Sequence, residues 1–219
     1  MSELQLTFAD IGRTDRYVRE ITYDETKPFI LGIHYARRMP TICHAFGLFE
    51  GGVLVGIVTY GIPASPSLCI GIAGKENQHN VMELNRLVML PGYNGDNRAS
   101  FLVGRSLKML PRYTFVVSYA DTAWTHIGYV YQATNFLYTG ATKARTDMAG
   151  EKGGHSRHYK VGEKHRVYRS SKHRYVYLVG NKRDRRKMKM KLKYPVMPYP
   201  KGDERRYDPS DPKQMGEKE

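Results

Sequence analysis

The sequence predicts an α/β domain with a basic C-terminal extension, and three observations support this fold class. Apolar residues make up 41% of the 219 residues, which is enough for one core of ordinary size. Runs rich in β-branched residues alternate with helical periodicity up to residue 141. The basic excess lies in residues 142–201, which hold 19 Lys/Arg against 4 Asp/Glu, whereas residues 1–141 hold 12 against 11. We expect a catalytic core over 1–141, a nucleic-acid-binding extension over 142–201 that packs on or continues the core, and a flexible tail over 202–219.

The central order of the core is expected to be strand, loop, helix, strand. Strands are predicted at GGVLVGIVTYG (51–61), VMELNRLVML (81–90) and TFVVSYA (114–120). The segment NRASFLVGRSLKML (97–110) places its apolar residues on one broad helical face, and Asn97 or Asp96 is a suitable N-cap.

A second helix and a further strand are expected after this unit. THIGYVYQATN (125–135) has helical spacing, with Thr122 or Thr125 as its cap, and places Tyr131 on a mostly apolar face. FLYTGAT (136–142) is then predicted to add a strand to the sheet.

The extension beyond residue 142 has a different character. Residues 143–166 are Gly-rich and basic and predict a loop, whereas HRYVYLVG (173–180) predicts an added strand. Lysines and apolar residues alternate over 187–193, so we expect an extended segment with its ammonium groups on one face.

Composition excludes several classes of protein. Two cysteines cannot form a disulfide framework, and no apolar run approaches the roughly 20 residues of a membrane span. The N-terminus lacks the order of a signal peptide, so we expect a soluble intracellular protein without membrane partners. A basic block binds polyanions by releasing counterions, although a solvated tail is an equally acceptable interpretation of such a block.

The loop LPGYNGDNRASF (90–101) is the first candidate binding site. A Gly-bearing turn before a helix offers unpaired backbone N–H groups to a phosphate or oxyanion, and Arg98 and Ser100 add side-chain donors. The alternative is a tight turn that needs Gly92 and Gly95 for backbone freedom.

Charged and aromatic residues elsewhere form further candidates. Within the strand 81–90, Glu83 is expected on one face and Arg86 on the other, as an ion-paired structural feature or as site residues. His34 and Tyr35 precede a basic turn and are more often packing than catalytic residues. The histidines beyond residue 150 lie among Lys and Arg at spacings that match no common zinc pattern, so no metal site is predicted.

Asp121 follows directly on a predicted strand. The carboxyl ends of strands in open α/β sheets are where ligands bind, and the rings of Trp124, His126 and Tyr131 follow closely. Asp121 and the Tyr131 hydroxyl are the polar groups that we expect to converge on one cavity.

The order of these elements, with the segment IGYVYQATNFLYTG, resembles the GNAT acyltransferases over residues 30–142. This resemblance implies a GNAT-like mixed central sheet flanked by helices. The pyrophosphate loop of that family has the form Gln/Arg-x-x-Gly-x-Gly/Ala. YNGDNRAS departs from this form, which disfavours ordinary acetyl-CoA binding.

Blocks along nearly the whole chain are similar to the Mom family of phage DNA-modification proteins. They are HY (34–35), VTYGIPAS (58–65), ELNRLVM (83–89), NRASFLVGRSLKML (97–110), VSYADTAWTHIGYVYQATNFLYTG (117–140), KHRYVYL (172–178) and PYPKG (198–202). The resemblance implies a transferase in the cytoplasm of the infected bacterium that converts the exocyclic amine of adenine in DNA to a carbamoylmethyl derivative and so protects phage DNA from restriction.

The resemblance also implies functional positions at Tyr35, Arg86, Ser100, Asp121 and Tyr131, with His34 and Glu83 as neighbours. The full set of candidates adds residues chosen from the sequence itself. The catalytic candidates are Tyr35, Ser100, Asp121 and Tyr131, and the substrate- or donor-binding candidates are His34, Glu83, Arg86, Asn97, Arg98, Trp124 and His126. Iron has been associated with the family, and only His34, Tyr35, Asp121 and His126 are suitable ligands. Basic residues of the extension are assigned to nucleic acid: Lys172, Arg174, Lys182, Arg183, Arg185, Arg186, Lys187, Lys189 and Lys191.

The mechanism that we infer uses an activated glycine, carried by a glycyl-tRNA or an acyl-CoA. Double-stranded DNA hides the adenine amine, so the base must be flipped into a pocket, where Tyr35 or Trp124 stacks on it. Asp121 is expected to act as general base or proton shuttle and Tyr131 as acid. Ser100 and Arg98 are expected to bind the oxyanion or a donor phosphate.

Two other interpretations remain open from the sequence. One is a GNAT-type N-acetyltransferase that acts on RNA or protein amines. The other is a non-catalytic basic nucleic-acid-binding protein, which explains the basic block but not Asp121 and its aromatic neighbours.

Overall fold

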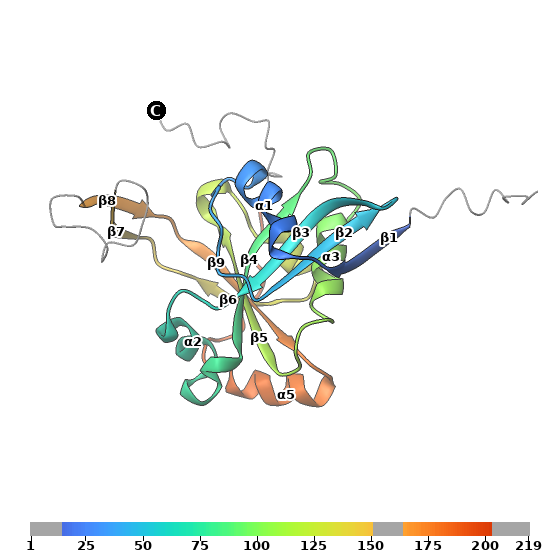
Figure 1. Ribbon diagram of the computed structural model, residues 1–219. Helices are drawn as coiled ribbons and strands as arrows, with labels where there is room; N and C mark the ends of the chain where they lie inside the picture. Colours follow the sequence, from blue (N-terminus) through green and yellow to red (C-terminus); the bar gives the residue numbers. More distant parts are fainter. Residues whose placement is uncertain (1–14, 151–163, 203–219) are drawn as a thin grey trace, which may run out of the picture.

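A mixed sheet of seven strands forms the centre of the computed structural model, which describes residues 15–150 and 164–202 (Figure 1). The strands lie in the order β1 (Arg16–Glu20), β2 (His44–Glu50), β3 (Val53–Gly61), β4 (Val81–Met89), β5 (Thr114–Asp121), β9 (Lys172–Val179) and β6 (Leu137–Ala141). Neighbouring strands are antiparallel except β4 and β5, which are parallel. All five strands expected from the sequence are confirmed.

Helices cover both faces of this sheet. They are α1 (Tyr23–Lys27), which continues into a π-helical turn (Pro28–Ile33), α2 (Pro66–Ala73), a 3₁₀ turn (Lys75–Asn80), α3 (Arg98–Ser106), a 3₁₀ turn (Thr122–Trp124), α4 (Tyr129–Ala133) and α5 (Lys182–Lys191). The expected mixed central sheet flanked by helices is confirmed. Within the described residues, no helix is both long and apolar enough to cross a membrane.

The central strand β5 buries both of its faces. Val116 packs in the same cluster as Leu102 of α3, whereas Phe115 and Val117 pack with residues of α2 and α5. Successive side chains of a strand point to opposite faces, so α3 lies on one side of the sheet and α2 and α5 on the other. A continuous apolar run is typical of a strand covered on both sides.

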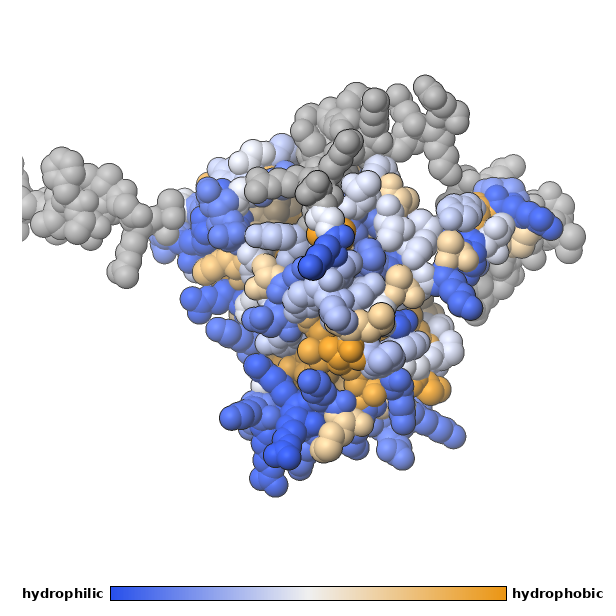
Figure 2. Space-filling model, turned by 180° about the vertical axis from the view of Figure 1, so that it is seen from behind, coloured by the Kyte–Doolittle hydropathy of each residue, from blue (hydrophilic) through white to orange (hydrophobic). Residues whose placement is uncertain are grey.

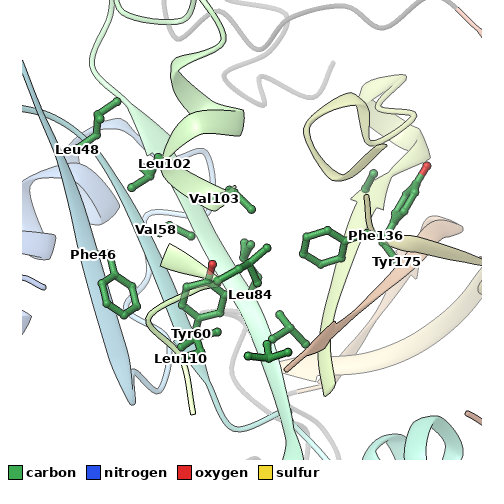
Figure 3. Packing of buried hydrophobic residues seen from close by; sticks show 14 of the residues in the cluster. Phe46, Leu48, Val58, Tyr60, Leu84, Leu102, Val103, Leu110, Phe136 and Tyr175 are labelled. Carbon is green, nitrogen blue, oxygen red and sulfur yellow. The ribbon is translucent and has the colours of Figure 1, made fainter. Parts of the chain in front are cut away.

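The largest core cluster fixes α3 against the sheet. Leu102 and Val103 of α3 lie near Phe46, Val58 and Tyr60 of strands β2 and β3 (Figure 3). The buried Tyr60 hydroxyl hydrogen-bonds the Ser106 hydroxyl at 2.7 Å, so the polar group that this packing buries is satisfied.

The parallel strands β4 and β5 separate soon after they begin. They pair only where Val81–Glu83 face Phe115–Val117. Beyond this point β4 stays paired with β3, whereas β5 stays paired with β9 over its whole length. The two carboxyl-terminal halves therefore diverge, and the sheet opens between them.

The helix expected from Thr122 or Thr125 begins later. Residues Thr122–Trp124 form a single 3₁₀ turn, Thr125 adopts a left-handed conformation, and α4 begins only after Gly128, which has a φ of 79°. The Asp121 carboxylate, rather than a threonine hydroxyl, accepts from the first free N–H, that of Ala123, at 3.0 Å. The predicted caps Thr122 and Thr125 were therefore wrong: Asp121 caps the 3₁₀ turn, and Gly128 occupies the N-cap position of α4.

The extended segment expected over 187–193 is instead helical as far as Lys191, the end of α5. Asn181 and Asp184 form a capping box in which each side chain accepts from the other's backbone N–H, and this starts α5. Of the two methionines, only Met188 is buried, while Met190 is 75% exposed. The alternation of lysine with apolar residues therefore does not reflect a strand with one buried face. The capping box at Asn181 starts a helix in its place.

Part of the expected loop over 143–166 is a β-ribbon. Strands β7 (Arg145–Gly150) and β8 (Lys164–Arg169) pair with each other and project from the side of the molecule (Figure 1). Residues 151–163, and most of the tail predicted over 202–219, lie outside the described residues. Asn97 does occupy the N-cap position of α3, but in a left-handed conformation and without a side-chain capping bond.

Candidate active site

A cavity of about 600 Å³ opens where β4 and β5 diverge. It is lined by the segment after the π-helical turn, by β4, by the start of α3, and by the chain from the end of β5 into α4. The residues predicted from the sequence that line it are His34, Tyr35, Glu83, Arg86, Asn97, Arg98, Ser100, Asp121, His126 and Tyr131. Segments far apart in the chain thus supply one space with acids, bases and rings.

Asp121 is held firmly at the edge of this cavity. Its Oδ2 lies 2.9 Å from Lys172 Nζ, and its Oδ1 accepts hydrogen bonds from the Ser170 hydroxyl and the Ala123 N–H. Burial acts to raise the pKa of Asp121, but these hydrogen bonds from Ser170, Lys172 and Ala123 outweigh it and keep the pKa below its ordinary value. The carboxylate is therefore ionised at neutral pH and is a strong hydrogen-bond acceptor but a weak base.

Glu83 has the opposite electrostatic character. It lines the cavity at the last position where β4 pairs with β5. Burial raises the pKa of its carboxyl group, although the charges of Arg86 and Lys172 act to lower it. A carboxyl group with a raised pKa is a better proton acceptor near neutral pH than an ordinary one. The sequence placed both acids near the site but could not separate their protonation properties.

A β-bulge brings Glu83 and Arg86 to the same face of β4. The register with β3 shifts at Asn85, because Thr59 faces Arg86 while Tyr60 faces Leu84. Leu84 and Leu87 consequently pack in one cluster, which strict alternation forbids. The expectation that Glu83 and Arg86 lie on opposite faces was wrong, since one extra residue changes the side to which all later side chains point.

Arg86 is half-buried in the cavity wall. Its Nη1 and Nη2 donate to the backbone carbonyls of Asn85 and Arg38 at 2.7 and 2.9 Å. Its buried Nε has no hydrogen-bond partner within the described part of the chain. Since a buried donor without a partner is costly, Arg86 is suited to a ligand oxygen.

Rings from two segments meet beside the cavity. His34 is buried, its Nδ1 accepts from the Ala36 N–H at 3.0 Å, and its ring stacks on Tyr35 at 4.3 Å between centroids. Burial, with a smaller effect of Arg86, lowers the pKa of His34 to about 4, so the ring is neutral at pH 7. Trp124 does not line the cavity, but its ring centre lies 5.7 Å from that of Tyr35.

The start of α3 forms another wall. The Arg98 guanidinium is bound by Glu50 at 3.0 Å and by Asp96 at 2.8 Å, so its charge is already compensated. The Ser100 hydroxyl donates to the Asn97 carbonyl at 2.9 Å. The Arg98 side chain is thus committed to ion pairs, and the Ser100 hydroxyl proton is committed to a backbone carbonyl.

Tyr131 and His126 complete the side formed after β5. The Tyr131 ring lies 5.3 and 5.4 Å from the rings of Phe136 and Tyr175, which fixes its position on α4. Burial lowers the pKa of His126, although the charge of Asp121 acts to raise it. His126 is therefore neutral at pH 7 as well.

The residues suggested for iron do not form a metal site. The acceptor nitrogen of His34 and both oxygens of Asp121 are occupied by protein donors. In the part of the chain that is described, no group of three or more His, Cys, Asp or Glu is placed to hold a metal ion. This geometry does not fit iron, and no step of the mechanism below depends on it.

Sequence reasoning missed two contributions to the site. Lys172 lines the cavity, whereas the sequence assigned it to the nucleic-acid surface, and Ser170 holds Asp121 from 49 residues away. Arg174 also lies within the fold, because it donates to Thr139 and stacks on Tyr194. No local sequence pattern predicts these contacts, because they form only when β9 pairs with β5.

The other predicted nucleic-acid ligands lie on α5. Lys182, Arg183, Arg185, Arg186, Lys187, Lys189 and Lys191 are all exposed there. Val179 at the end of β9 faces Thr114 at the start of β5, so α5 begins at the end of the sheet opposite Asp121. From the length of β5, the separation is about 25 Å.

Solved acetyltransferases are similar to this chain in structure. An N-acetyltransferase from Staphylococcus aureus Mu50 is 17% identical, with a TM-score of 0.47 over 76% of this chain and 100% of that one. A GNAT family acetyltransferase from Elizabethkingia anophelis with acetyl-CoA bound is 9% identical, with a TM-score of 0.45 over 76% of this chain and 99% of that one. We draw no conclusion about activity from these similarities.

The sequence comparisons are more specific. The methylcarbamoylase Mom of Escherichia phage Mu is 30% identical in an alignment of 187 positions that covers 77% of this chain and 76% of that protein. Residues 15–201, which include every residue that lines the cavity, match the Mom protein family. The chain belongs to the Mom protein family.

Proposed function

We propose that this chain is a phage transferase that converts the exocyclic amine of adenine in DNA to a carbamoylmethyl derivative and thereby protects the DNA from restriction. The observation that carries this proposal is the convergence of Glu83, Arg86, Ser100, Asp121 and Tyr131 on one cavity. Membership of a family that includes a phage methylcarbamoylase supports the same reaction. The cavity volume of about 600 Å³ is sufficient for a base and the end of a donor.

The target adenine reaches the cavity as a flipped base. In a duplex its amine lies in the stack and cannot meet the side chains of β4 and β5. Tyr35 is 46% exposed, lines the cavity and has Trp124 beside it. This pair offers the aromatic surface on which the extruded base stacks.

The first chemical step is acyl transfer from an activated glycine. The adenine amine attacks the glycyl carbonyl, a carbon–nitrogen bond forms, and the bond from that carbonyl to the donor oxygen or sulfur breaks. Glu83 accepts the amine proton, because its raised pKa makes it the stronger base. Tyr131 protonates the leaving group.

Asp121 holds the amine for this attack. An ionised carboxylate offers about four acceptor positions, and Ser170, Ala123 and Lys172 occupy three of them. The remaining position accepts an N–H of adenine and orients the nitrogen lone pair toward the donor. Arg86 Nε donates to the oxygen that gains charge in the transition state.

A rearrangement then converts the acyl product into an alkyl product. The free glycine amine attacks carbon 6 of the purine and forms a five-membered spiro ring. Collapse of this ring breaks the bond from carbon 6 to the original adenine nitrogen. That nitrogen becomes the amide of a carbamoylmethyl group, and no oxidant or reductant is consumed.

The donor is a glycyl-tRNA or a glycyl thioester of CoA. The start of α3 supplies backbone N–H groups at the cavity wall, which suit a phosphate of either donor. The seven cations of α5 provide a second surface for a polyanion, about 25 Å from Asp121 by the length of β5. A tRNA is large enough to reach both places, which favours it over CoA.

Mass spectrometry of nucleosides tests this function. DNA from cells that express the chain is digested and compared with DNA from cells that carry an empty vector. We expect deoxyadenosine bearing one carbamoylmethyl group only in the first sample. Acetylated RNA or protein without modified DNA would support the acetyltransferase interpretation, and no modification at all would support a binding protein.

A further inference from the structure

Among the described residues that follow residue 142, exposed basic side chains gather on two separate surfaces. One is α5, at the end of the sheet where β5 begins, and the other is the ribbon of β7 and β8 (Figure 1). In the view from behind, hydrophilic side chains gather over both (Figure 2). Only the ribbon is joined directly to the cavity.

The root of the ribbon is fixed to the active site. Ser170, the residue after β8, donates to the Asp121 carboxylate. The Thr122 hydroxyl donates to the Ser171 carbonyl at 2.7 Å, and the Ser171 hydroxyl donates to the Thr142 carbonyl at 2.7 Å. The orientation of the ribbon is thus tied to the residue that receives the adenine.

One face of the ribbon combines a cation with apolar side chains. The register places Met148 opposite Arg166 and Thr146 opposite Tyr168, and residues directly opposite each other share a face. Tyr168 is 70% exposed and Met148 44% exposed, although the two strands pair only with each other. A protein core does not cover this face, so its exposed ring and guanidinium are available to a partner.

The other face carries a compensated positive charge. Arg145 lies opposite Arg169, and both contact the Asp147 carboxylate, at 2.9 and 3.7 Å. Two opposed arginines repel each other unless an acid lies between them. Asp147 therefore keeps the ribbon regular while the face retains a net positive charge.

We propose that the β7–β8 ribbon enters the major groove of the DNA duplex beside the flipped adenine, with Arg166 and Tyr168 against the base edges. The inference rests on the proposed function for the identity of the duplex. A B-form major groove is about 12 Å wide and admits a two-stranded ribbon. The six residues of β7 span about 20 Å, which is long enough to follow the groove floor.

The shape of the major groove allows the ribbon to distinguish duplex DNA from other nucleic acids. The major groove of an RNA duplex is deep and narrow, and side chains cannot reach its bases. A single strand has no groove at all. The ribbon should therefore contribute to binding of duplex DNA and contribute little to binding of the other two.

The test compares two double variants by fluorescence anisotropy on labelled duplex DNA, duplex RNA and single-stranded DNA. In Arg166→Ala/Tyr168→Ala the affinity for duplex DNA should fall about tenfold, and the affinity for the other two should be nearly unchanged. The control Lys108→Ala/Tyr23→Ala removes an exposed cation and a 48% exposed ring elsewhere and should bind like the wild type. Thermal unfolding of both variants checks the fold.

Two results would overturn the proposal. One is unchanged affinity of the ribbon variant for duplex DNA. The other is an equal loss for duplex DNA, duplex RNA and single strands, which would mean that the ribbon attracts any polyanion. Absence of modified adenine in cells that express the wild-type chain would contradict the proposed function instead, and the comparison of affinities would stand on its own.

Discussion

Lys172 Nζ lies 2.9 Å from Asp121 Oδ2, so the first residue of β9 is ion-paired with the last residue of β5. Only 15% of the Asp121 side chain is exposed, so the carboxylate is largely shielded from solvent, whereas 39% of the Lys172 side chain is exposed. Lys172 also acts on Glu83, whose pKa it lowers against the larger effect of burial. One ammonium group thus influences both acids that the proposed mechanism uses.

Replacing this lysine should raise the pKa of both carboxyl groups. In Lys172→Met, Asp121 loses a donor and Glu83 loses a favourable charge. Titration of the side-chain carboxyl carbons by NMR measures both values without knowledge of the donor. Lys108→Met, a change at an exposed site outside the cavity, should leave the pKa values of Asp121 and Glu83 unchanged. An unshifted Asp121 in Lys172→Met would show that the ion pair does not form in solution.

The same pair should make stability depend on pH. The pKa of Asp121 is lower in the folded than in the unfolded chain, so its contribution is complete above the unfolded value of about 3.9. The contribution is lost as the pH falls through the folded value. Urea unfolding should therefore show wild type more stable than Lys172→Met at pH 7, with the difference shrinking in acid. A difference that grows in acid would contradict this assignment.

Asp121 and Glu83 should respond differently to neutral substitutions. Asp121→Asn keeps the shape but loses the charge that holds the amine, and we expect modified deoxyadenosine to disappear while duplex binding persists. Glu83→Gln removes the proposed proton acceptor, with a loss of about a hundredfold or more in yield. Nucleoside mass spectrometry measures both variants. Normal yield in Glu83→Gln would return the role of base to Asp121.

Gly128 is required for the turn into α4. Its φ is 79°, and an added Cβ would lie 2.5 Å from the Tyr175 ring. Gly128→Ala should cost about 1–3 kcal/mol in the free energy of unfolding, from backbone strain and steric clash. Gly92→Ala is the matched control, because φ is 84° there but no atom lies within 4 Å. Equal losses in the two variants would remove the clash as a cause.

The methionines of α5 test the helix that the sequence pattern did not predict. Met188 is fully buried and Met190 is 75% exposed. Met188→Ala should cost about 2–5 kcal/mol, and Met190→Ala less than about 0.5 kcal/mol. Denaturant unfolding measures both. Similar losses would fit an extended segment that buries both side chains, and would contradict the helix.

Sequence periodicity identified β3, β4, β5, β6 and β9 through their apolar and β-branched runs, and it missed β1, β2, β7 and β8. It failed in α5, where Asn181 and Asp184 form a capping box that outweighs the alternation of lysine and methionine. It failed again at Asn85, where a bulge breaks the alternation of β4. Both failures come from one or two residues that act through hydrogen bonds of the backbone, which periodicity does not describe.

In the candidate site too, the sequence predicted what depends on local pattern and missed what depends on contacts between distant segments. The sequence indicated Asp121 because it follows a buried strand directly, and Tyr131 because its hydroxyl interrupts a mostly apolar helical face. It did not indicate the contact with Ser170, because that contact arises only when β9 lies between β5 and β6. The hydrogen bond from Ser170 is one of the contacts that lower the pKa of Asp121, together with those from Lys172 and Ala123.

Isotope tracing shows whether the modifying group comes from glycine and which nitrogen of the product it supplies. Cells that express the chain are fed glycine labelled with heavy carbon and heavy nitrogen, and the modified deoxyadenosine is fragmented in a mass spectrometer. We predict both labels in the modified base, with the heavy nitrogen attached to carbon 6 of the purine and an unlabelled nitrogen in the amide. A modified base without label, or one whose heavy nitrogen lies in the amide, would contradict an activated glycine that rearranges in this cavity.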